Sequence, residues 1–93
     1  MYQIAYAQSA RRALKRLRRG HSFPEERLKE IVTLFMFGRI LPVLFKDHQL
    51  HGEFAHLREC HIGFNLLLLY KRNEELRVVT IANIGTHSEL FGE

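Results

Sequence analysis

The second half of the chain carries three strand-like patterns of apolar and polar residues in close succession. Residues 55–62 mix polar and apolar positions, residues 64–71 are almost continuously apolar, and residues 76–84 are rich in β-branched side chains. A continuous apolar run predicts a central strand, and the short polar connection at residues 72–75 predicts a hairpin. Strands joined by short links pair antiparallel. Residues 2–6 alternate weakly and predict one further strand.

The first half instead repeats its apolar residues at helical spacing. Residues 9–19 predict a helix with Ser9 as its N-cap and Gly20 as its stop. Ser22 and Glu25 have the spacing of a capping box, so a second helix is expected from there to about Phe37. Both helices are amphipathic, and their apolar stripes should face one core.

This order of elements predicts the fold class. A strand, two helices and three strands indicate an α+β domain: an antiparallel twisted sheet (β-α-α-β-β-β) with a two-helix hairpin packed on one face. A chain of 93 residues is expected to form a single domain over residues 1–93. Four phenylalanines are most simply explained as core packing: Phe35, Phe37, Phe45 and Phe64.

Charge is distributed unevenly along the chain. Residues 1–20 carry six basic residues and no acidic residue, so the remainder sums to −2 within a total of +4. A basic helix is typical of proteins with an acidic partner, such as nucleic acid, an acidic protein or an anionic membrane, although a solvated helix face explains it equally well. The single cysteine, Cys60, excludes an intramolecular disulfide. No secretory signal or membrane-spanning run is evident, so a cytoplasmic location is expected.

Three short segments place a histidine beside other polar groups: residues 46–48, 58–61 and 85–91. Histidine titrates near neutral pH, so a cluster of histidines suits proton transfer. Residues two apart on a strand share a face, so Glu59 and His61 should lie together on the open face, away from the core. By the same rule Asn83 should share a face with Ile81 on the last strand.

Each of these histidines alone could be an ordinary surface residue, and together they favour one site. A zinc site is the rival explanation for the chain's six histidines. The sequence lacks a His-Glu-x-x-His motif and a Cys-x-x-Cys pair, so no metal and no other cofactor is expected. His51, His21 and His56 are expected to be exposed or structural.

The same segments carry a family resemblance. Leu41-Pro42, the Lys46-Asp47-His48 stretch, residues 58–62, residues 67–71 and residues 85–91 resemble, in order and spacing, the YafQ branch of the RelE/ParE toxin superfamily. The resemblance implies a ribosome-dependent mRNA endonuclease that cuts without a metal, by attack of the 2′-hydroxyl on the adjacent phosphorus. It also implies a cognate antitoxin as partner, of the ribbon-helix-helix, DinJ-like kind, and no membrane association.

The resemblance assigns roles to individual residues. His87 takes the place of the family's general acid, and His48 and His61 take the places of a base or charge stabiliser. Glu59 is the acidic residue before the second histidine, and Phe91 matches an aromatic residue near the substrate. Contacts to RNA are expected from basic residues of the first helix and of the motifs: Lys15, Arg16, Arg19, Lys46 and Arg58.

Two positions depart from the family pattern. Asn65 stands at the place of a family aspartate that is a candidate base, and Asn83 stands where many relatives have arginine. Each loss could slow cleavage by roughly 10²-fold or more. The alternative is therefore a weak or inactive member that still binds antitoxin and ribosome. A gyrase-poisoning toxin of the ParE type is a third possibility, which the histidine cluster disfavours.

Overall fold

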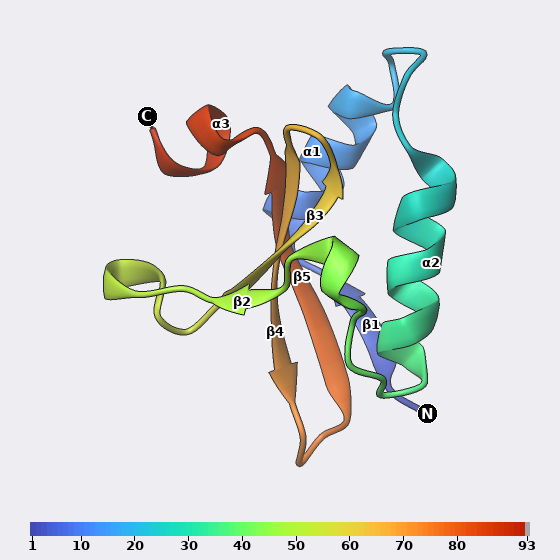
Figure 1. Cartoon of the computed structure of the whole chain (residues 1–93), viewed down its shortest axis with the longest axis vertical. Helices are drawn as coiled ribbons and strands as arrows, with labels where there is room; N and C mark the ends of the chain where they lie inside the picture. The colour runs from blue at the N-terminus through green and yellow to red at the C-terminus, as the bar shows by residue number, and fades with distance from the viewer. Residues whose placement is uncertain (93) are drawn as a thin grey trace.

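A five-stranded sheet forms the centre of the computed structural model, which describes residues 1–92 (Figure 1). Its strands lie in the order β1-β5-β4-β3-β2. The strands, α-helices and short 3₁₀ turns follow one another along the chain as β1 (Gln3–Tyr6), α1 (Gln8–Leu17), α2 (Glu25–Met36), η1 (Val43–Phe45), β2 (His48–Gln49), η2 (Gly52–Phe54), β3 (Arg58–Gly63), β4 (Leu66–Asn73), β5 (Val78–Gly85) and α3 (His87–Phe91).

The predicted α+β class is confirmed, with one pairing that differs. Strands β2 to β5 pair antiparallel, as expected, whereas β1 joins β5 in parallel. Parallel pairing requires a long connection between the two strands. The chain between β1 and β5, which includes both helices and the other three strands, supplies it. None of the helices within residues 1–92 is long and apolar enough to cross a membrane.

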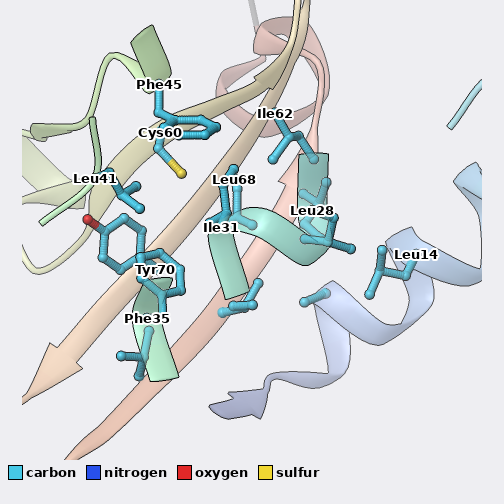
Figure 2. Packing of buried hydrophobic residues seen from close by; sticks show 14 of the residues in the cluster. Leu14, Leu28, Ile31, Phe35, Leu41, Phe45, Cys60, Ile62, Leu68 and Tyr70 are labelled. Atoms are coloured by element: carbon cyan, nitrogen blue, oxygen red, sulfur yellow. The ribbon is translucent and has the colours of Figure 1, made fainter. Parts of the chain in front are cut away.

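The core lies between the two helices and one face of the sheet. Leu14 of α1 and Ile31 of α2 pack with Cys60 of β3 and Leu68 of β4, and all four are buried (Figure 2). Phe45, from η1, closes the side of this core and is fully buried. The two helices run in opposite directions, and the chain turns between the end of α1 and the start of α2, as expected of a hairpin (Figure 1).

Both helices begin differently from the sequence prediction. The N-cap of α1 is Ala7, not Ser9, because the amide of Ala7 still pairs with the carbonyl of Ile81 at 2.9 Å and so fixes where the strand ends. The N-cap of α2 is Pro24, and no side chain caps it. Glu25 instead accepts two hydrogen bonds from Arg18 of the other helix, at 2.6 and 3.1 Å.

Two of the four phenylalanines expected in the core are outside it. Phe35 and Phe45 are buried, but Phe37 is 60% exposed and Phe64 is fully exposed. Phe37 follows the last residue of α2, so the helical stripe no longer governs its direction. Phe64 lies in the two-residue turn between β3 and β4, where neither face of the sheet covers it.

A bulge in β5 overturns the predicted facing of Asn83. Tyr70 pairs with Ile81 and Leu69 with Asn83, so one residue of β5, Ala82, has no partner on β4. Such an extra residue reverses the alternation beyond it. Asn83 therefore lies on the face opposite to Ile81, which is the open face predicted for Glu59 and His61.

Gly38 and Gly52 provide a matched test of how tightly the chain packs just after α2. Both have positive φ, of 66° and 67°. A Cβ on Gly38 would stand 2.7 Å from the ring of Tyr2, whereas one on Gly52 would meet nothing within 4 Å. Gly52→Ala is expected to lower the free energy of unfolding by about 1 kcal/mol through backbone strain alone.

Gly38→Ala is expected to cost at least about 1 kcal/mol more, because the Tyr2 ring must also move. That ring is held by a hydrogen bond to Glu74 and by Arg72, whose guanidinium carbon lies 4.7 Å from the ring centroid. Urea denaturation of both variants checks the comparison. Equal losses would contradict the close packing at Gly38.

Candidate active site

A hollow of about 400 Å³ opens where the β2–β3 edge of the sheet meets the C-terminal helix α3. Eight residues line it: His48, Leu50, His51, Glu53, Phe54, Glu59, His87 and Phe91. Four of them are candidate site residues from the sequence, namely His48, Glu59, His87 and Phe91. They come from three separate segments of the chain, so the fold brings together what the motifs only suggested.

The strand register explains this convergence. His48 pairs with Glu59, Glu59 with Leu69, and Leu69 with Asn83, so one row crosses four strands on the open face. The next row runs from His61 through Leu67 to Gly85, which leads within two residues to His87. The candidate residues therefore occupy two adjacent rows of the same face.

Glu59 is the centre of the cluster. Its side chain is only 8% exposed, and its Oε1 lies 3.3 Å from Nε2 of His48 and 3.8 Å from Nε2 of His61. The Nδ1 of His48 lies 2.9 Å from the carbonyl oxygen of Lys46, which can only accept, so Nδ1 donates. His48 thus donates to the Lys46 carbonyl through Nδ1, and when it is protonated its Nε2 forms an ion pair with Glu59.

His61 is held closer to the neutral state. Burial lowers the pKa of its imidazole, and the positive charges of Lys46 and His48 lower the pKa further, while Glu59 acts in the opposite direction. At neutral pH the environment favours His61 as a proton acceptor.

Asp47 anchors the segment that carries His48 and Lys46. Its carboxylate accepts hydrogen bonds from the hydroxyl of Tyr70 at 2.6 Å and from Arg58, whose Nε and Nη2 lie 3.2 and 3.3 Å away. Tyr70 is itself buried against Phe35. Because neighbouring residues alternate sides, fastening Asp47 toward the core turns His48 toward Glu59.

The helix α3 is fastened in a similar way. Thr86 and Glu89 form a capping box at the N-terminus of α3. The amide of Thr86 donates to the carboxylate of Glu89, and the amide of Glu89 donates to the hydroxyl of Thr86. The amide of Thr86 and the guanidinium of Arg16, 2.9 Å away, both lower the pKa of Glu89. Arg16, expected at RNA, therefore lies in an ion pair that holds the turn bearing His87.

Phe91 completes the wall of the hollow. Its ring meets that of Phe54 edge to face, with centroids 5.0 Å apart, and lies 4.9 Å from the ring of His87. This places an aromatic surface beside the imidazole at the rim. An aromatic surface of this kind is suited to stacking on a planar ring.

No group of three or more histidine, cysteine, aspartate or glutamate side chains within residues 1–92 is arranged to hold a metal ion. Glu59 with its two imidazoles is the densest such cluster described above. A carboxylate and imidazoles at these distances are suited to proton transfer and charge stabilisation.

Residues 2–92 match the family model of YafQ, a bacterial toxin of a type II toxin-antitoxin system. The chain belongs to the YafQ toxin family. A relative in Escherichia coli strain K12, the mRNA interferase toxin YafQ, is 34% identical over 67 residues, which are 71% of each chain.

Solved structures agree with this membership. A metal-bound toxin from Helicobacter pylori is 31% identical, with a TM-score of 0.88, over 98% of this chain and all of that one. YafQ in the E. coli DinJ-YafQ complex is 27% identical, with a TM-score of 0.85, over 99% of this chain and all of that one.

The remaining candidate residues of the toxin lie outside the hollow. Asn65 is exposed in the β3–β4 turn and is not among the residues that line it. Lys15 of α1 and Arg19, which follows the end of α1, line a separate groove. Arg58 is engaged with Asp47, and the half-buried Asn83 accepts a hydrogen bond from the amide of Ile84 at 2.9 Å.

Sequence reasoning gave no site role to four of the residues that line the hollow, namely Leu50, His51, Glu53 and Phe54. His51 lines the hollow although its motif gave it no role, and Phe54 supports Phe91 from a turn that shows no pattern. Asp47 was part of a motif, but its partner Tyr70 lies 23 residues further along the chain. Only the polar end of an otherwise apolar strand, at Tyr70, hinted at a buried hydrogen bond.

The surroundings of His61 can be tested by NMR titration of its imidazole protons. The pKa of His61 is expected below the ordinary value of about 6.5. Glu59→Gln should lower it further, because the favourable charge is lost, and Lys46→Met should raise it. Lys29→Met, on the exposed face of α2, is the control and should change nothing. A rise in Glu59→Gln would contradict the described electrostatics.

Proposed function

We propose that this toxin is an endoribonuclease that cleaves mRNA on the ribosome, using the Glu59 cluster and His87 and no metal. The supporting observation is that His87 and Phe91 share one hollow with His48 and the buried Glu59. The E. coli relative named an mRNA interferase gives the same reaction class.

In this proposal, each step of cleavage is assigned to a side chain of the candidate site. Neutral His61 takes the proton of the 2′-hydroxyl, and the carboxylate of Glu59 stabilises the imidazolium that forms. The 2′-oxygen then bonds to phosphorus while the bond to the 5′-oxygen breaks. His87 gives its proton to that leaving oxygen. The products are a 2′,3′-cyclic phosphate and a 5′-hydroxyl, so atoms and protons balance.

Cationic groups stabilise the charge that develops on phosphorus. When His48 carries a proton, it lies between the backbone carbonyl of Lys46 and the carboxylate of Glu59, and the exposed Lys46 side chain acts electrostatically on His61. Lys46 has a φ of 52°, a left-handed conformation that is costly for a lysine and is often found at functional sites. In this scheme the base is a histidine, so Asn65 does not have to supply one.

The remaining surface supports the partners of such a toxin. The exposed cations Lys15, in α1, and Arg19, just after it, suit docking on ribosomal RNA, and Arg16 of α1 pairs with Glu89 of α3. The E. coli DinJ-YafQ complex supports a DinJ-type antitoxin as the silencing partner. A toxin acting on translating ribosomes works in the cytoplasm, as one domain over the whole chain.

His87→Ala is expected to slow cleavage by roughly 10²- to 10⁴-fold, because the leaving oxygen loses its proton donor. Primer extension on a reporter mRNA in a translating extract measures the cut. His21→Ala is the matched control, since His21 is an exposed histidine between α1 and α2, and it should cleave like the wild type. Intact mRNA with the wild-type toxin would overturn the proposed function and favour a non-catalytic binding module.

A further inference from the structure

A second hollow is lined by His61, whose neighbour Glu59 lines the first one. It has a volume of about 430 Å³ and is lined by residues of the β3–β4 turn, the start of α2 and the segment before β2. His61 lines it while also lying 3.8 Å from Glu59. The reacting groups therefore line two hollows, of which the proposed mechanism uses only one.

Phe64 is the most conspicuous residue of this second hollow. Its aromatic side chain is fully exposed at the β3–β4 turn, although the sequence predicted that Phe64 would lie in the core. The turn faces the start of α2, because Gly63 and Pro24 line the same hollow. A large apolar ring exposed to water costs hydrophobic free energy that a stacked partner would recover.

The hollow also carries positive charge. Arg27 of α2 lies with its guanidinium carbon 5.1 Å from the ring centroid of Phe45, which fixes its direction, and Glu30 offsets it only weakly at 3.7 Å. Lys46 lines the same hollow. No acidic residue is among those that line it within residues 1–92. Two cations beside one exposed aromatic ring match the phosphate and the base of a single nucleotide.

We infer that this hollow is a nucleotide subsite, in which a base of single-stranded RNA stacks on Phe64 and its phosphate meets Arg27 and Lys46. The inference rests on the proposed function and deepens it, because it gives the RNA a path. The strand passes from the Phe91 hollow over His48 and Glu59, past His61, to Phe64. Arg27 and Phe64 bind substrate and take no part in proton transfer.

Binding of a fluorescein-labelled 2′-O-methyl RNA tetranucleotide, followed by fluorescence anisotropy, tests the subsite. The methyl group blocks attack, so binding is measured without cleavage. Phe64→Ala is expected to weaken binding by about 5- to 150-fold, the range for one stacked base. Arg27→Gln should also weaken it and reduce the salt slope by about 0.7, as for one lost phosphate contact.

Matched controls lie at the other end of α2. Phe37 and Arg39 are an exposed aromatic and a cation that line a separate hollow there. Phe37→Ala and Arg39→Gln are expected to bind RNA like the wild type. Both pairs of side chains are at the surface, so thermal melting should show all four variants folded.

Equal affinity of Phe64→Ala and wild type, or no binding by the wild type, would overturn the subsite and leave this surface to a protein partner. The outcome is separable from that of the proposed function. If the subsite alone is wrong, the wild type still cuts reporter mRNA and His87→Ala does not. If the function is wrong, the wild type leaves the mRNA intact.

Discussion

The burial of one carboxylate, that of Glu59, is the constraint on which the site depends. A charged group removed from water is costly unless cations or donors compensate it. Glu59 is 8% exposed, and the groups nearest to it are the imidazoles of His48 and His61. The carboxylate therefore stabilises whichever ring is protonated. In the proposed mechanism, this arrangement lets His61 accept a proton without reorganisation.

Two sets of contacts outside the hollow position the side chains of this cluster. Asp47, bonded to Tyr70 and Arg58 on the core side, turns the adjacent His48 toward Glu59. At the other wall, the Thr86–Glu89 capping box and the Arg16 ion pair hold the short helix that carries His87. The first joins the site to the hydrophobic core, whereas the second joins it to the basic helix. The five-residue α3 could not keep its shape without such contacts.

The motifs could place His48, Glu59 and His87 on one face because strand alternation and short turns are local rules. They failed where tertiary structure decides. The bulge at Ala82, which moves Asn83 to the open face, leaves no mark in an apolar β-branched run. Glu25 has the spacing of a cap but bonds Arg18 from another helix. Phe64 has the apolar character of a core residue, and only the position of the turn exposes it.

The coupling of Glu59 to His61 is measured most directly by a double-mutant cycle on the single-turnover rate of mRNA cleavage. Rates are compared for wild type, Glu59→Gln, His61→Ala and the double variant. If Glu59 works through His61, Glu59→Gln slows the wild type strongly but slows His61→Ala much less. Losses that multiply in the double variant would show two independent residues and contradict the shared-carboxylate account.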